Sequence, residues 1–169
     1  FKLNNKNLYL NTSYTGMIGD TWSVNTGASY TLASNRIDVI LNEIDDTENS
    51  FHVKAKLKKR FSSRVKLAFG AEHFFTNFNE DFQGDFEDIS VSENYGYKAN
   101  ISALFAESDI IFSKKFAMKI GLRAEYTDIM DAFTLSPRAS VAYKTGRKSQ
   151  LSLAYGDFYQ NPVSEYLKF

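Results

Sequence analysis

The sequence predicts an all-β fold: an antiparallel up-and-down meander of about eight long strands, forming a barrel or part of a larger transmembrane β-barrel. Three observations predict this fold class. Apolar and polar residues alternate with a period of two, most of the alternating segments are long, and short connections alternate with long ones. A period of two sorts side chains onto the two faces of a strand, whereas a helix would scatter the same residues around its axis.

The clearest alternation lies at residues 116–126, where the even-numbered positions are apolar and the odd-numbered ones from Lys119 to Glu125 are charged or glycine. The same alternation predicts strands at residues 8–14, 22–32, 51–58, 65–75, 97–105, 116–126, 138–144 and 150–156. The longest of them run to about ten residues or more, and about nine to eleven tilted residues cross a bilayer. Strand length is therefore evidence for a membrane as well as for β-structure. The aromatic residues near the strand ends fit the interfacial girdles of such a barrel.

The connections between the predicted strands differ in length and in charge. Short turns are predicted at residues 16–21, 60–64, 113–115 and 145–148, and long loops at 33–50, 77–96 and 128–135. The long loops hold 13 acids and one base, Arg36, whereas the turns and their flanks hold nine bases and one acid, Asp20. Alternate connections of a meander lie at the same end, so the pattern predicts tight basic turns at one end and long acidic loops at the other, as in outer-membrane barrels.

The acidic loops supply the candidate ligand-binding residues, because an acidic rim attracts cations and repels anions. These candidates are Asp45, Asp46, Glu48, Asp81, Asp85 and Asp88. Residues 79–88 loosely resemble a calcium loop, but Ser90 stands where a bidentate Glu would be needed. A solvated acidic loop is therefore favoured over a calcium site.

Nothing in the sequence predicts catalysis or a cofactor. There is no Ser/His/Asp arrangement, phosphate-binding glycine loop or dinucleotide fingerprint, so we expect no enzyme and no catalytic residue. The chain has no cysteine, and His52 and His73 have no partner at metal-ligand spacing. A net charge of zero gives no reason to expect nucleic acid as a partner.

Charged residues on the polar face have a structural explanation. Glu107, Asp109, Arg123, Glu125 and Arg138 are predicted to share that face on neighbouring strands. We expect a ladder of cross-strand ion pairs there, such as Arg123–Glu107 or Glu125–Arg138, rather than acid–base chemistry.

The C-terminal half of the chain resembles a known family. The stretches that carry the resemblance are ALFAE at 103–107, GLRAEY at 121–126, LSPRASVAY at 135–143, LSLAYGDFYQNP at 151–162 and EYL at 165–167. In order and spacing this series resembles the barrel of TonB-dependent outer-membrane receptors, most closely the Bacteroidetes-type outer-membrane β-barrel family. The motif match covers residues 97–169, and the first 96 residues fit by alternation alone.

The resemblance implies a function and an incomplete barrel. Such receptors have a 22-stranded barrel, an N-terminal plug and TonB as a partner, and they import a scarce nutrient such as a metal chelate across the bacterial outer membrane. Residues 1–169 are then expected to be a single barrel segment without the plug, in contact with outer-membrane lipid. A chain that opens at Phe1 without a signal peptide is expected to be a mature segment or a piece of something larger.

Two other architectures also have about eight strands. One is a small self-contained outer-membrane barrel with a structural or adhesion role, and the other is a soluble lipocalin-like ligand-binding barrel. The N-terminal motif of lipocalins has Gly and Trp two residues apart, whereas Gly19 and Trp22 are three apart, so the motif does not match. Because eight strands cut from a larger barrel would leave two bare edges, the chain is expected to close on itself or to pair its edges with another copy.

Overall fold

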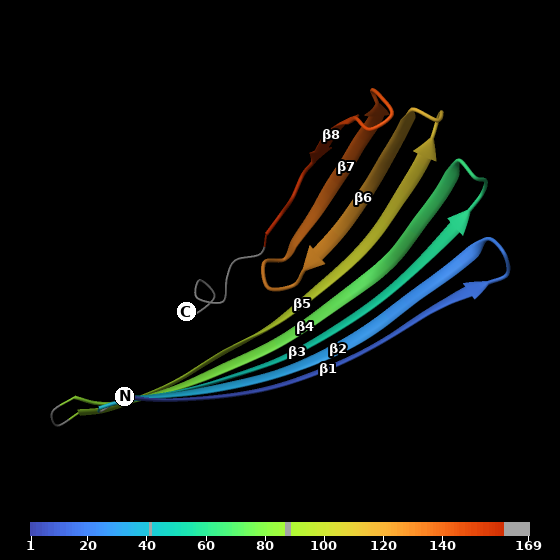
Figure 1. Ribbon diagram of the computed structural model, residues 1–169. Coiled ribbons are helices and arrows are strands. Elements are labelled where there is room, and N and C mark those ends of the chain that lie inside the picture. The colour runs from blue at the N-terminus through green and yellow to red at the C-terminus, as the bar shows by residue number, and fades with distance from the viewer. Residues whose placement is uncertain (41, 87–88, 161–169) are drawn as a thin grey trace.

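The computed structural model describes residues 1–40, 42–86 and 89–160, and it confirms the all-β meander (Figure 1). Eight antiparallel strands form one sheet in which each strand pairs with its neighbours along the chain. The strands are β1 (Lys2–Ile18), β2 (Trp22–Val39), β3 (Asn42–Arg60), β4 (Val65–Phe86), β5 (Ile89–Ile111), β6 (Phe116–Thr127), β7 (Ala132–Lys144) and β8 (Gln150–Gly156).

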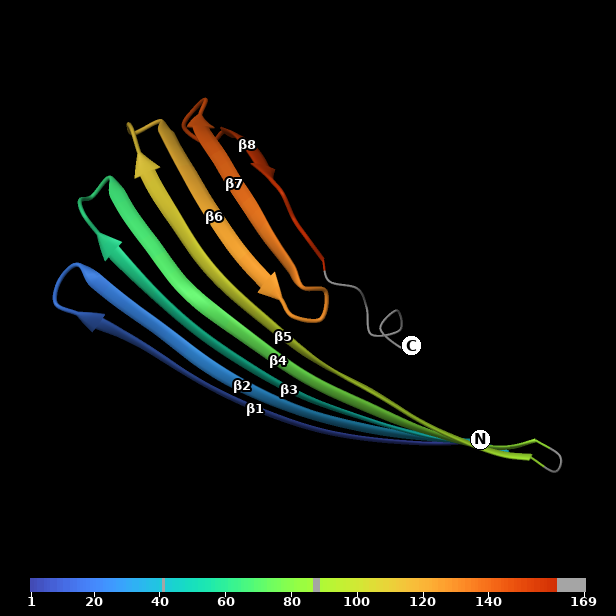
Figure 2. The same cartoon turned by 180° about the vertical axis from the view of Figure 1, so that it is seen from behind.

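The sheet is open, which corrects the expectation that the chain closes on itself. Strands β1 and β8 lie at opposite edges in both views and each pairs on one side only (Figures 1 and 2). Their lengths do not match, because β1 has 17 residues and β8 has 7. Neither a self-contained eight-stranded barrel nor a lipocalin-like barrel is therefore formed. Pairing of the edges with another copy stays a prediction.

The cross-strand register sorts the side chains as the alternation predicts in most strands, but not in β5. In residues 97–105 the alternation groups Ile101 and Phe105 on the apolar side, whereas the register pairs them with Phe74 and Gly70 on the same face as Glu72. One row of direct partners runs through Leu10, Tyr30, Phe51 and Phe75, and all four are apolar or aromatic. The adjacent positions form a second set that is mostly polar or small, with Phe74 and Phe105 among the exceptions, because neighbouring residues of a strand point to opposite faces. We call these two surfaces the apolar face and the polar face. Glu107, Asp109, Arg123, Glu125 and Arg138 all lie on the polar face, as predicted.

The predicted long loops are wrong, because most of their residues belong to strands. β2 continues to Val39 and β3 begins at Asn42. In the same way, β4 continues to Phe86 and β5 begins at Ile89. The turn after β6 is also short, since β7 begins at Ala132. Alternation disappears in these segments because both faces carry polar residues, and a period of two can be seen only where one face is apolar. Long hairpins therefore extend the sheet beyond its apolar band.

Aromatic residues mark the limits of the apolar band. Ten residues separate Phe116 from Tyr126 on β6 and Phe133 from Tyr143 on β7, and all four lie on the apolar face. Ten residues at about 3.3 Å each, tilted by about 40°, span about 25 Å, the height of the band on a transmembrane barrel. Tyr97 was expected in a girdle but lies on the polar face, where its ring stacks on Phe78 at 5.5 Å.

A single layer of strands has almost no interior. In the described part of the chain the buried apolar residues are Ala68, Phe78 and Ala103, and no large side chain is fully buried. Across these residues, no helix with the length and hydrophobicity of a membrane span is found. Because burial of apolar surface is the main favourable term in folding, the apolar face of this sheet needs cover from outside it.

Candidate functional site

The polar face of β3 to β7 carries a dense set of ionisable side chains that we call the charged wall. Its members are Lys54, Lys56, Lys58, Glu72, Glu107, Asp109, Lys119, Arg123, Glu125 and Arg138. The set has six bases and four acids, so the wall has an excess of positive charge. Sequence alternation placed these residues on one face, but their contacts depend on the register.

Glu72 is the centre of the charged wall. Its carboxylate lies 3.0 Å from Lys54 Nζ and 3.4 Å from Arg123 Nη1, and its side chain is 10% exposed. Arg123 also donates from Nη2 and Nε to Glu125 Oε2, at 2.7 and 3.0 Å. Ala103 is the direct partner of both Glu72 and Glu125, and its small side chain leaves room for Arg123 to reach across β5. The cluster thereby ties β3, β4 and β6 together.

A second ion-pair cluster joins β3, β5 and β6 nearer the basic turns. Lys119 Nζ lies 3.0 Å from Glu107 and 3.4 Å from Asp109, and Lys58 Nζ lies 3.8 Å from Asp109. All four side chains are more than a third exposed. Exposed pairs of this kind contribute about 0–1 kcal/mol each.

The individual ion pairs proposed from the sequence are wrong, although the ladder itself is present. Glu107 pairs with Lys119 rather than Arg123, because the register sets Gly121 opposite Glu107 and Phe105 opposite Arg123. Arg138 does not pair with Glu125. Its guanidinium lies over the Phe158 ring, 4.8 Å from the centroid.

The charged wall has a small hollow between its two ion-pair clusters. It measures about 180 Å³, and its lining includes Lys56, Phe105, Gly121 and Arg138. Within the described residues neither Lys56 nor Arg138 has a carboxylate at ion-pair distance. Lys54, Arg123, Glu72 and Glu107 also line the hollow, so four bases and two acids border it.

The two histidines, His52 and His73, lie on opposite faces of the sheet. His52 stacks on Phe74 on the polar face, with ring centroids 3.8 Å apart. His73 lies on the apolar face, where its Nδ1 is 2.9 Å from Ser102 Oγ. Over the described ranges of the chain, no group of three His, Cys, Asp or Glu side chains could hold a metal ion.

The acidic candidates are divided between the two faces of the extended hairpins. Asp45 and Asp81 are direct partners on the continuation of the apolar face, whereas Asp46 and Glu48 lie on the polar face. Asp46 accepts a hydrogen bond from Asn35 at 2.7 Å, and Glu48 accepts one from Ser50 at 2.8 Å. Asp85 occupies a position in β4, and Asp88 lies outside the described residues. The structure does not gather these residues into one loop, and a ligand site among them stays a prediction.

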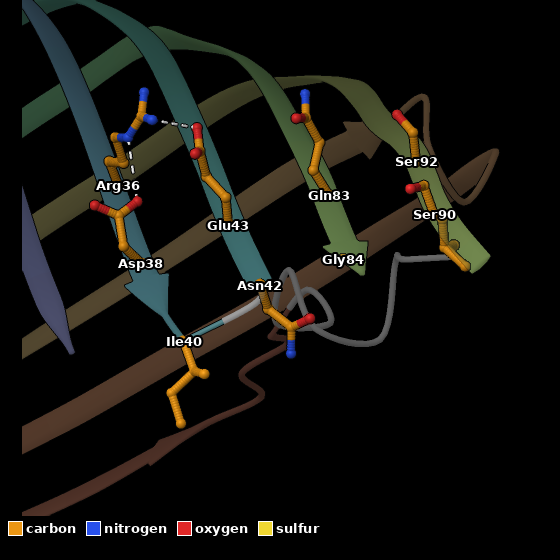
Figure 3. Close-up of a pocket in the computed structure, with 10 residues that line it drawn as sticks. Arg36, Asp38, Ile40, Asn42, Glu43, Gln83, Gly84, Ser90 and Ser92 are labelled. Carbon is orange, nitrogen blue, oxygen red and sulfur yellow. Dashed lines mark hydrogen bonds and ion pairs between the residues drawn. The ribbon is translucent and has the colours of Figure 1, made fainter. Parts of the chain in front are cut away.

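Arg36 is surrounded by carboxylates near the tip of the first long hairpin (Figure 3). Its guanidinium contacts Glu43 at 2.5 Å, Asp38 at 3.3 Å and Asp45 at 3.5 Å. Desolvation lowers the pKa of Arg36, but the hydrogen bond to Asp38 and the attraction of the three carboxylates outweigh it and raise the pKa above its ordinary value. Arg36, Asp38 and Glu43 border a hollow of about 610 Å³ together with Gln83, Ser90 and Ser92. Arg36 holds the acidic strands together against their mutual repulsion.

Asp128 forms an anchor that the sequence did not indicate. The backbone N–H and the side-chain amide of Asn100 each donate to its carboxylate at 2.6 Å, which ties the β6–β7 tip to β5. These two hydrogen bonds lower the pKa of Asp128 below its ordinary value. The two residues are 28 positions apart, and only the register brings them together.

Asp128→Ala is expected to speed amide hydrogen exchange at Asn100, because the mutation removes the acceptor of that N–H. A carboxyl with a lowered pKa contributes stability above its unfolded pKa of about 3.9, and this contribution is lost as the pH falls through the folded value. In the unmutated protein the anchor should therefore open only below about pH 3.9. Asp131→Asn is the control, since Asp131 accepts from Tyr126 and not from Asn100. Equal exchange at Asn100 in both variants would contradict the assignment.

Nearly the whole chain matches a known protein family. The match covers residues 1–168, and the family is described as "Outer membrane protein beta-barrel family". No curated protein sequence matches the chain.

Several solved structures have a similar fold. The ferric yersiniabactin uptake receptor FyuA from Yersinia pestis is 11% identical with a TM-score of 0.74, over 89% of this chain and 27% of the receptor. The alcaligin outer membrane receptor FauA from Bordetella pertussis is 10% identical with a TM-score of 0.77, over 91% and 29%. The RagAB peptide importer is 11% identical with a TM-score of 0.71, over 91% and 22%. The chain spans less than a third of each structure, and at these identities the likeness concerns the fold.

Proposed function

Because this chain belongs to the outer membrane protein beta-barrel family, we propose that it forms part of the barrel of a TonB-dependent receptor that imports a scarce nutrient. Membership places the protein in the bacterial outer membrane. The observation that carries the proposal is an open sheet that follows the fold of FauA with a TM-score of 0.77 over 91% of its length while spanning 29% of that receptor. An open sheet of this size fits one sector of a larger barrel. The Bacteroidetes type stays a prediction.

In this arrangement the two faces have different surroundings. The apolar face contacts lipid, and the charged wall faces the lumen, where a plug domain would cover it. The long acidic hairpins would lie outside the cell and the tight basic turns in the periplasm, as is usual for outer-membrane barrels. The acidic rim would raise the local concentration of cations at the entrance.

The proposed cargo is a metal chelate, and the proposed energy source is TonB. Uptake of a panel of radiolabelled ferric chelates by cells that carry the full-length protein tests both. We expect uptake of at least one chelate that disappears when TonB is deleted. Uptake at the same rate without TonB, or no uptake of any chelate, would contradict the proposal, and uptake of peptides alone would reassign the cargo.

Adjacent residues of β2 test which face meets lipid. Ala28 lies on the apolar face opposite Val53, and Ser29 lies on the polar face opposite His52. Ala28→Arg is expected to cost about 1–2 kcal/mol of unfolding free energy, because it places a charge in the hydrocarbon region, one row of side chains inside Tyr30 and Phe51. Ser29→Arg should cost less than about 1 kcal/mol, because it places the same side chain in a polar lumen. Urea unfolding in lipid vesicles measures both, and a larger cost for Ser29→Arg would reverse the assignment of the faces.

A further inference from the structure

The apolar face contains a groove whose lining combines apolar and polar groups. It has a volume of about 450 Å³ and crosses β3 to β7. Its lining on the apolar face consists of Val53, Ala55, Ala71, His73, Ser102, Leu104, Ala124, Tyr126 and Phe133. Leu104 and Phe133 protrude beside it, with exposed fractions of 66% and 64%, while Ala71 and Ala124 are the direct partners of Leu104 on either side.

His73 is the unusual residue of this groove. Ser102 occupies its Nδ1, and among the described residues no partner is present for its Nε2. A polar group that faces hydrocarbon without a hydrogen-bond partner is unfavourable, and ionisable residues at membrane depth commonly mark functional sites. Nε2 therefore needs a partner from outside the sheet.

The depth of His73 limits what that partner can be. His73 is two residues from Phe75, and it shares a row with Ser102 and Tyr126 near the edge of the apolar band toward the hairpin tips. Tyr126 marks this edge on β6 and Phe75 lies two residues beyond His73 on β4, so His73 lies within about 5 Å of the edge. This level lies between the hydrocarbon and the headgroups, where lipids carry ester and hydroxyl groups. The alanine-lined part of the groove extends from there toward the centre of the band.

We propose that the groove holds a resident lipid, with an acyl chain over Ala71 and Ala124 and an ester or hydroxyl oxygen hydrogen-bonded to His73. The groove is continuous with the lipid-facing surface, so a lipid reaches it without crossing any barrier. Among the described residues, Glu72 is the one carboxylate residue in its lining, and its carboxylate lies on the polar face with Lys54 and Arg123, so the apolar side of the groove fits acyl chains. The proposal rests on family membership and not on the proposed transport function, and it goes beyond that function.

The test is native mass spectrometry of the full-length protein, purified from outer membranes and exchanged into fresh detergent. The wild type is expected to keep a bound lipid, which extraction then identifies as a phospholipid or a glycolipid. Ala71→Leu combined with Ala124→Leu fills the groove and should abolish retention. Ala139→Leu is the control for added bulk, since it places a leucine on the apolar face of β7 outside this groove, and it should retain the lipid.

His73→Leu separates a ligand contact from a structural role. It should lower lipid retention about tenfold, the effect of losing one hydrogen bond, while leaving the urea midpoint unchanged or raised. The proposal is overturned if the wild type carries no lipid, if the filled groove retains as much lipid as Ala139→Leu does, or if a polypeptide or a second copy of the protein is bound there instead.

Discussion

Glu72→Ala is expected to lower the unfolding free energy by about 2–3 kcal/mol, somewhat less than the roughly 3–5 kcal/mol that breaking a fully buried ion pair costs. The substitution removes the carboxylate that Lys54 and Arg123 share and leaves two cations facing each other across β4. Arg123 is 20% exposed and keeps Glu125, but Lys54 has no other carboxylate at ion-pair distance in the described residues. The 40% exposure of Lys54 lets water screen part of this cost.

Two further variants separate charge from position. Glu72→Gln keeps the shape and one acceptor oxygen and removes the charge, so it should cost less than Glu72→Ala. Glu107→Ala removes a carboxylate from the same face, but Glu107 is 39% exposed and its partner Lys119 keeps Asp109. It should cost less than about 1 kcal/mol. Urea unfolding in lipid vesicles measures all three, and equal costs for Glu72→Ala and Glu107→Ala would show that Glu72 is not the centre of the wall.

The faces of the sheet could be predicted from the sequence, but the contacts on them could not. Alternation places Lys54, Glu72 and Arg123 on one face because a period of two is a local property of the chain. Whether Arg123 meets Glu107 or Glu72 depends on which residue of β5 lies between them. The small side chain of Ala103 lets Arg123 reach across β5, whereas the ring of Phe105 would block it. Only the register determines where these two residues lie.

The prediction of where the strands end was wrong for a related reason. Asp45 and Asp81 are direct partners in a ladder, but the sequence around them shows no alternation because neither face is apolar there. The acidic residues were assigned to loops on composition, and the structure assigns most of them to strands. The acidity of that end of the sheet was predictable, because it is a property of composition and chain order alone.

Gly70→Val is expected to cost about 3 kcal/mol or more, because position 70 has no space for a side chain. A Cβ there would overlap the main-chain oxygen of Ala55 and lie 2.6 Å from Phe105 Cζ. Phe105 is the direct partner of Gly70 and covers it, and Lys54 Nζ lies 5.6 Å from the centre of that ring. Gly70→Ala should cost about 1–3 kcal/mol, since Phe105 would have to move but the main chain of β3 cannot.

Gly27→Ala is the control, because Gly27 also lies inside a strand on the polar face and is the direct partner of Lys54. A Cβ there would meet Thr12 O at 3.5 Å, an ordinary contact. Alanine at that position should be neutral or stabilise by about 0.5–1 kcal/mol, because glycine loses more conformational freedom than alanine when it is fixed in a strand. Opposite signs for the two glycines in urea unfolding would show that Gly70 is required by the packing of Phe105 beside the Glu72 cluster. A similar cost at both positions would mean that the strands tolerate no added bulk on this face, and the specific role of Phe105 would have to be abandoned.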